Sequence, residues 1–501
     1  MKMTTNFLLT AVVALSVGAS SALAQNHPSA MFAPTASYYA ADVGDLESRI
    51  FKLEEDMKKK QDAVDTKRRF SVDVSGRVFM DAVNFSPNYG AVAPTTGTNN
   101  PNPNGGVSDY IGLRDARIGV GGRGYEVLDY RAELSYERGA LRMTDVFMGV
   151  RKVPGLDYVR VGHYKVETGM SYMTSGRNST AMERAASVGT FSPGRRLGIS
   201  QIYLFGNDQV RWFNGVFLAR DISGGMFHSP TATHENNGTT RVANDMNMSN
   251  RGTIFNSRFS MVPYYAKDGE RFFHLGGHYM YREKDDKGFA GNMSTSTAIG
   301  GFSRAGNAGW LSTQTAAWNY NQGGIELAWG RDRLAISSEL FAGSFGNGRD
   351  MYGGYAEVRY FLTKDSRPYS KSSGTPGNVK MRNNFLTGDD VVQTLCHGRA
   401  KVFGIQSIGA WEVYAQWSFV DSDRVAFFDG PTGPSRGGRA VDTAFGLNWY
   451  WNPNTRMMFE YVHSNRTQQA ATGYPISSGT GNDSYRRASV DTFATSLRFS
   501  F

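Results

Sequence analysis

Residues 158–198 read YVRVGHYKVETGMSYMTSGRNSTAMERAASVGTFSPGRRLG, and this stretch decides which fold the chain can adopt. Its first residues, 158–164, alternate in the manner of a β-strand, with Val159 and Val161 on one face. About thirty residues of polar, glycine- and serine-containing sequence follow before the strand pattern returns near Leu197. A compact soluble domain rarely contains so long a structureless loop. A wide β-barrel accommodates one, because the loop can fold back into the lumen and narrow it.

This loop is rich in positive charge, which only Glu167 and Glu183 oppose. A constriction lined by cations attracts anions, because a low-dielectric wall focuses the field of fixed charges. We therefore predict that the loop 166–195 forms an anion-binding constriction. The alternative for Arg184 is an ion pair with Glu183 or a wall carboxylate that holds the loop. The predicted constriction residues are Lys165, Arg177, Arg184, Arg195 and Arg196.

From Phe70 onward, hydrophobic residues recur with a period of two. Strands of roughly ten residues, apolar outward and polar inward, are typical of outer-membrane barrels. The predicted fold class is all-β: a sixteen-stranded antiparallel transmembrane β-barrel with a short N-terminal α-helical coiled coil. The sixteen predicted segments lie near 70–85, 110–122, 125–138, 140–152, 157–165, 196–206, 209–220, 252–263, 270–283, 320–330, 332–344, 351–363, 408–421, 440–452, 455–466 and 488–501.

Connector lengths support this strand count, since tight turns such as Arg123-Gly124 and Arg331-Asp332 alternate with longer loops. Short periplasmic turns and longer external loops are expected of such a barrel. The connector 364–407 is an exception, because it is long although it falls on the periplasmic side. One explanation is a hairpin in this connector that the strand count misses. Sixteen strands leave a water-filled channel.

The N-terminal region precedes the predicted barrel domain, 69–501. Residues 1–24 have a lysine, an apolar run and an Ala-Leu-Ala cleavage site, which indicate a secretory signal peptide. Residues 25–43 are predicted to be a flexible leader. Residues 44–68 carry a heptad pattern that predicts a periplasmic coiled coil, the alternative being an amphipathic helix on the barrel rim. The single Cys396 excludes an intrachain disulfide.

Strand parity predicts which charged side chains face the lumen. For each arginine, an ion-paired structural role is the alternative to a role in permeation. At the C-terminus, Phe501 ends an outward apolar row, and we predict that it is needed for membrane assembly. No metal-ligand spacing and no catalytic set are found, so neither a metal, a cofactor nor an enzyme is expected. The predicted lumen-lining residues are Arg77, Arg117, Arg131, Arg258, Arg359, Arg498, Glu133 and Asp145.

Several segments of the barrel resemble the phosphate-selective porin O and P family. They are VGHYK (161–165), MERA (182–185), SPGRRLG (192–198), YAEVRYFLTKDSRPY (355–369), GAWEVYAQW (409–417) and NWYWNPNTRMMFEYVHSN (448–465). The resemblance covers about residues 70–501, with gaps at the loops. It implies a trimeric anion channel of the outer membrane, with an inward-folded third loop and an arginine-lined path. It carries over most directly to Lys165, Arg184, Arg195 and Arg196. Lysine is scarce near the predicted constriction, where Lys165 is the clear candidate.

The leading functional prediction is a passive, anion-preferring porin in the outer membrane of a Gram-negative bacterium, passing ions such as phosphate or chloride. The formal net charge of +9 fits anionic solutes or lipopolysaccharide, whereas an exported protein rarely meets nucleic acid. The alternatives are a general non-specific porin, or a structural barrel whose coiled coil tethers the outer membrane to the cell wall through peptidoglycan.

Overall fold

The structure is a computed structural model that describes residues 48–59, 70–88, 109–137, 140–219, 252–283, 319–346, 348–385, 408–422, 426–430, 433–436, 438–469 and 485–501. The predicted signal peptide and leader lie outside the described residues, as do both ends of the predicted coiled coil. The chain divides into two compact units, residues 1–69 and 70–501.

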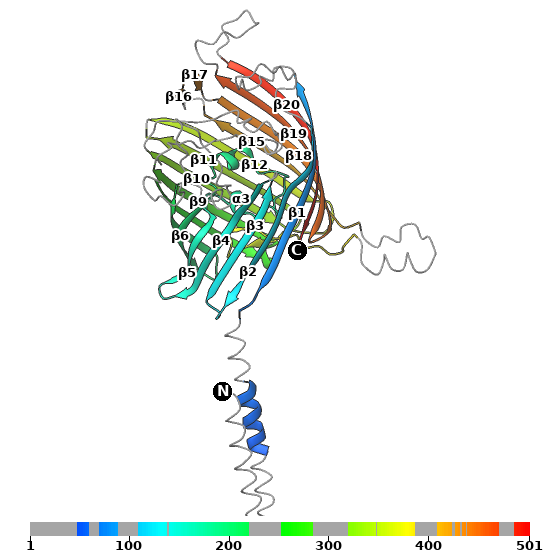
Figure 1. Cartoon of the computed structure of the whole chain (residues 1–501). Coiled ribbons are helices and arrows are strands. Elements are labelled where there is room, and N and C mark those ends of the chain that lie inside the picture. The colour runs from blue at the N-terminus through cyan, green and yellow to red at the C-terminus, as the bar shows by residue number, and fades with distance from the viewer. Residues whose placement is uncertain are drawn as a thin grey trace, which may run out of the picture. The chain divides into compact units, whose positions relative to one another are not determined.

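The second unit is a closed barrel of sixteen strands in which every neighbouring pair is antiparallel (Figure 1). The predicted strand number is therefore confirmed. The wall strands are β1 (Asp73–Asn88), β2 (Tyr110–Gly124), β3 (Leu128–Glu137), β4 (Ala140–Val153), β5 (Leu156–Lys165), β6 (Arg195–Phe205), β7 (Val210–Leu218), β8 (Thr253–Ala266), β9 (Arg271–Glu283), β10 (Asn319–Arg331), β11 (Leu334–Phe345), β12 (Arg349–Phe361), β15 (Ala410–Asp421), β18 (Gly438–Asn452), β19 (Thr455–Gln469) and β20 (Tyr485–Ser500).

Side chains along each wall strand alternate between the two faces of the barrel. In β8, Ile254 and Arg258 are fully buried on the inner face, whereas Phe255 and Phe259 are 42% and 45% exposed on the outer face. An apolar outer row of this kind is what lipid requires. The pattern that predicted the strands from sequence is thus the pattern that divides lumen from membrane.

The barrel closes where the first strand pairs with the last, over the register from Arg77 opposite Ser500 to Asn88 opposite Ser489. Phe501 extends the pairing, because its N–H donates to the Gly76 carbonyl oxygen at 3.0 Å and its own carbonyl accepts from the Gly76 N–H at 3.0 Å. Closure satisfies backbone groups that would otherwise face hydrocarbon without partners.

Shorter elements lie between the wall strands. The loop 166–194 contains two helices, α3 (Met170–Met173) and α4 (Ala186–Phe191), and is therefore not structureless. The other elements are η1 (Lys267–Gly269) and two hairpins, β13 (Tyr369–Ser370) with β14 (Thr375–Pro376), and β16 (Ala426–Gly430) with β17 (Gly433–Arg436).

The connector after β12, the exception among the expected short periplasmic turns, folds against the inner side of the barrel in its described part, 362–385. Tyr369 is 2% exposed, and its hydroxyl lies 2.6 Å from Nδ1 of His274, which is fully buried on β9. Tyr369 also packs in a cluster with Met170 of the loop helix α3. The β13–β14 hairpin is thus a missed hairpin, but it lies beside the loop and is no part of the wall. Residues 386–407 are outside the described residues.

In the first unit, residues 48–59 form a helix with an ion pair of 2.7 Å between Lys59 and Glu55. The heptad residues Ile50, Leu53 and Met57 are 48%, 62% and 69% exposed. A helix is thus confirmed there, and its pairing in a coiled coil stays a prediction. In the described parts of the chain, we find no helix that is both long enough and apolar enough to cross a membrane.

Candidate channel constriction

The loop 166–194 is bonded along its length to inner-face side chains of strands far from it in sequence. Gln322 on β10 donates to the Phe191 carbonyl at 2.9 Å, and Asn448 on β18 donates to the Thr180 carbonyl at 2.9 Å. In the other direction, the Ser171 N–H donates to Oε1 of Glu339 on β11 at 2.7 Å. These bonds hold the loop against inner-face residues on several sides of the barrel.

Arginines from the wall hold the tip of the loop by its carbonyl oxygens. Arg498 donates to Met182 at 2.6 Å, and Arg114 donates to the same carbonyl at 2.9 Å. Arg456 donates to Ser179 at 2.7 Å. Because a guanidinium group offers several donors in a fixed plane, it can fix a backbone segment in one position. These arginines therefore position the loop.

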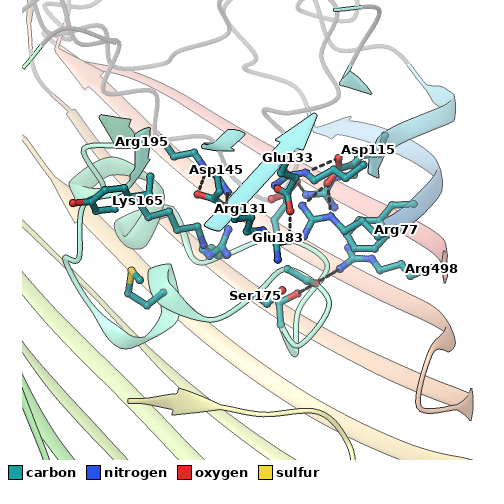
Figure 2. A pocket seen from close by; sticks show the side chains of 18 of the residues that line it. Arg77, Asp115, Arg131, Glu133, Asp145, Lys165, Ser175, Glu183, Arg195 and Arg498 are labelled. Atoms are coloured by element: carbon teal, nitrogen blue, oxygen red, sulfur yellow. Dashed lines mark hydrogen bonds and ion pairs between the residues drawn. The ribbon is translucent and has the colours of Figure 1, made fainter. Parts of the chain in front are cut away.

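A space of about 470 Å³ lies between the loop and the wall formed by β20 and β1 to β6 (Figure 2). Its lining carries eight arginines and one lysine against four carboxylates, a formal excess of five positive charges. The cations are Arg77, Arg114, Arg117, Arg131, Arg160, Lys165, Arg184, Arg195 and Arg498, and the carboxylates are Asp115, Glu133, Asp145 and Glu183.

All four carboxylates of this space are paired. Asp115 accepts from Arg77 Nε at 2.8 Å and from Arg117 Nε at 3.0 Å. Glu133 accepts from Arg117 at 3.1 Å and from Arg131 at 2.5 Å. The other two pairs are Asp145 with Arg195, at 2.9 and 3.1 Å, and Glu183 with Arg114. The remaining cations thus give the lining its net charge.

Lys165 and Arg184 contribute charge without a carboxylate partner among the described residues. The Lys165 ammonium donates to the Tyr172 carbonyl oxygen at 2.8 Å. Arg184 donates to the carbonyls of Ser171 at 3.0 Å and Thr174 at 2.7 Å. The alternative in which Arg184 pairs with Glu183 or a wall carboxylate is therefore wrong for these residues. Arg184 does hold the loop, but through hydrogen bonds to two backbone carbonyls and not through an ion pair.

Nine of the predicted constriction and lumen residues line the 470 Å³ space, and four do not. Arg196 donates to the Ala219 carbonyl at 2.9 Å. Arg258 is buried in a bidentate pair with Glu326, at 2.8 and 2.6 Å. Arg359 lies 3.3 Å from the Thr180 hydroxyl, beside a different space. Arg177 is partly buried in the loop and does not line the space.

The two-residue alternation of the sequence did not identify three charged residues that line the space: Arg114, Asp115 and Arg160. Asp115 shares the inner face of β2 with the predicted Arg117, and Arg160 alternates with Val159 and Val161 on β5, so parity could have found both. Arg114 could not be found in this way, because the register of β1 with β2 shifts between Phe79 and Met80. A bulge of this kind turns an otherwise outward side chain inward.

Taken together, a closed barrel with an apolar outer face and a charged, partly open interior defines an outer-membrane porin. More specifically, the chain belongs to the family described as Phosphate-selective porin O and P, which it matches over residues 88–483. The family and the fold indicate a channel rather than an enzyme.

The individual relatives share less than a third of their residues with this chain. The chain is 23% identical to Porin O of Pseudomonas aeruginosa over 467 residues, which cover 87% of this chain and 90% of that protein. It is 27% identical to an uncharacterised protein of Caulobacter vibrioides over 265 residues, 52% of this chain and 49% of the relative. Among solved structures, an anion-selective porin from Comamonas acidovorans matches 86% of this chain and 100% of its own, at 11% identity and a TM-score of 0.42.

Proposed function

We propose that the protein is a passive outer-membrane channel that prefers anions and is constricted by the loop 166–194. The observation that carries the proposal is the lining of the 470 Å³ space, where nine cations face four carboxylates. At an effective dielectric constant near that of water, a unit charge a few ångströms away is worth about 1 kcal/mol to a passing anion, and more where the pore is narrow. The excess of cations over carboxylates in this lining therefore favours anions over cations.

The test is the reversal potential of single channels in a gradient of potassium chloride. In an anion-preferring channel, the reversal potential has the same sign as the equilibrium potential of chloride. The preference should weaken as salt rises, because the Debye length falls to about 3 Å at 1 M. A channel that does not discriminate, or prefers potassium, would instead be a general porin.

The preferred anion is a separate part of the proposal. Family membership favours phosphate, and the arginine-rich lining offers planar donor groups that suit oxyanions. Among the described residues of the lining, Lys165 is the only lysine. Addition of inorganic phosphate to a chloride-conducting channel distinguishes the two cases. Block of the chloride current at low phosphate concentration supports a phosphate preference, and an unaltered current supports general anion passage.

We further propose that the protein assembles as a homotrimer in lipid and lipopolysaccharide, with the helical segment 44–68 in the periplasm as an additional contact. The support is the apolar heptad row Ile50, Leu53 and Met57, which is exposed on helix 48–59. Exposed heptad rows are stabilised by pairing with further helices. Deleting 44–66 should leave the barrel folded and lower the stability of the trimer. Sedimentation with isolated peptidoglycan tests whether the same segment tethers the barrel to the cell wall.

A further inference from the structure

Glu339, on the inner face of β11, binds the first part of the loop 166–194. Its Oε1 atom accepts from the Ser171 N–H at 2.7 Å and from the Tyr355 hydroxyl at 2.8 Å, and the residue is 1% exposed. Gly169 lies so close to the Oε2 atom that a Cβ at this position would overlap it, and its φ of +136° also favours glycine. Glycine at this position therefore allows the carboxyl group to lie against the loop.

Glu460, on the inner face of β19, binds the loop tip in the same way. Its Oε2 atom accepts from the Met182 N–H at 2.8 Å and from the Tyr414 hydroxyl, and the residue is 5% exposed. Tyr414 lies two strands away, on β15, and reaches Glu460 across Gly446 of β18, where a Cβ would overlap the tyrosine ring. At both sites, one carboxyl oxygen thus binds a loop N–H and a tyrosine.

The two loop residues that these acids bind also bind arginines of the 470 Å³ space. Arg184 donates to the Ser171 carbonyl at 3.0 Å. Arg498 and Arg114 donate to the Met182 carbonyl at 2.6 and 2.9 Å. Each acid therefore fixes the N–H of a residue whose carbonyl fixes one or two lining arginines. A shift of either loop residue would move those arginines.

Glu339 and Glu460 are buried without a cationic partner. Their neighbour Glu326, by contrast, pairs with Arg258 at 2.6 Å. Within the described parts of the chain, neither Glu339 nor Glu460 forms an ion pair. Burial without a counter-charge favours the uncharged acid, because removing a lone carboxylate from water is costly. The hydrogen bonds agree, since an uncharged carboxyl group can accept both bonds at one oxygen and carry its proton on the other.

The charged and titratable groups that face the two acids do not supply such a partner. The two charges nearest Glu339 pair with each other. Near Glu460, Glu183 pairs with Arg114, and Arg498 binds the Met182 carbonyl. The groups that face Glu339 are Glu326 on β10, Arg258 on β8 and Tyr355 on β12, and those that face Glu460 are Tyr414 on β15, Arg498 on β20 and Glu183 in the loop.

We propose that Glu339 and Glu460 are proton-carrying positioning residues of the constriction, whose uncharged form holds the lining arginines in place and preserves the anion preference. Loss of either proton adds a negative charge beside the loop and lowers that preference. The inference rests on the proposed function for the sign of the preference. The charge state of the two acids is tested separately, by the difference between wild type and variants that cannot ionise.

The experiment measures the reversal potential in a gradient of potassium chloride between about pH 6 and about pH 10. One variant of the full chain carries Glu339→Gln and Glu460→Gln, which keep an acceptor oxygen for the loop and the tyrosine but cannot ionise. A second carries Glu339→Leu and Glu460→Leu, which remove the acceptor. Glu270→Gln is the matched control, because Glu270 pairs with Lys380 at the surface, at 2.6 Å. Heat-modifiable migration identifies the folded variants.

At about pH 6, where buried glutamates are uncharged, we expect a several-fold lower anion-to-cation permeability ratio in the leucine variant and its rescue in the glutamine variant. As pH rises, the ratio should fall several-fold in wild type and in the control, and less in the glutamine variant. Lys165 can lose its charge in all of these proteins, so the difference between wild type and the glutamine variant isolates the two acids.

Two results would overturn the uncharged state: a higher anion preference of the glutamine variant than of wild type at low pH, or an equal fall in both as pH rises. An unaltered ratio in a folded leucine variant would overturn the positioning role, and the glutamine comparison decides the charge state even where the leucine variant does not fold. A wild-type channel without anion preference contradicts the proposed function alone. A shift toward cations at high pH that the glutamine variant lacks would still support the two acids.

Discussion

Arg367 donates a hydrogen bond of 2.7 Å to the carbonyl oxygen of Asn178, although 189 positions separate the two residues in the chain. Asn178 lies in the loop after β5, and Arg367 lies in the connector after β12. The contact therefore joins two segments that lie outside the barrel wall and are far apart in the sequence. It makes the position of the loop depend on the connector as well as on the wall.

Removing an acid from the lining should increase anion preference. Asp145→Asn raises the formal excess of positive charge by one and frees Arg195 from its bidentate pair. We expect the anion-to-cation permeability ratio to rise by up to several-fold in dilute chloride, corresponding to about 1 kcal/mol. The reversal potential measures it. Asp129→Asn is the control, since Asp129 pairs with Arg151 outside this space and should leave the ratio unaltered.

Neutralising the two cations that form no ion pair with a carboxylate among the described residues should have the opposite effect. Lys165→Gln and Arg184→Gln each remove one positive charge from the lining, so both should lower the permeability ratio for anions. Glutamate at both positions should abolish or reverse the preference. If the double glutamine variant keeps the wild-type reversal potential, these two residues do not set selectivity.

Arg184→Gln should also differ from Lys165→Gln in current noise. Arg184 joins the carbonyls of Ser171 and Thr174, so its loss releases two points of the loop at once. Lys165 holds only the Tyr172 carbonyl. We expect larger fluctuations of the open-channel current in the Arg184 variant, recorded under identical salt and voltage. Equal noise in the two variants would argue against loop fixation by Arg184.

Loss of the terminal aromatic residue should impair assembly. Phe501→Ser keeps the backbone pair with Gly76 but removes a ring that is 51% exposed at the end of the closing strand. We expect a sharp reduction of the protein in outer-membrane fractions at unaltered synthesis, measured by immunoblot. Phe493→Ser, which removes another outward ring of β20, is the control for a general loss of apolar surface. Equal reduction in both variants would deny Phe501 a special role.

The turn after β10 should contribute a pH-dependent term to stability. Hydrogen bonds from Arg271, followed by Lys267, lower the pKa of Asp332 from its ordinary 3.8 to about 2. A depressed pKa means that the stabilisation is present above about pH 4 and is lost as pH falls through about 2. The unfolding temperature of wild type should therefore approach that of Asp332→Asn on acidification. A constant difference down to about pH 2 would contradict this assignment.

The sequence predicted the parts of this protein that follow a local rule. Lipid outside and water inside impose a two-residue alternation on each strand, so the sixteen strands could be read from single segments. The same parity placed Arg77, Arg131 and Asp145 on the inner face, where they line the large space. The positive loop after β5 was recognisable because its length and charge are unusual for a connection.

The tertiary structure alone decided how those charges are used. Parity shows that Arg258 and Arg131 both face inward, but only the fold buries Arg258 against Glu326 and leaves Arg131 beside the open space. Likewise, the shift of register near Phe79 brings Arg114 inward, against the local alternation. The connector's path and the bond from Arg367 to Asn178 follow no local period. These partners meet because closure of the barrel brings distant segments together. A pattern of neighbouring residues does not encode such long-range contacts.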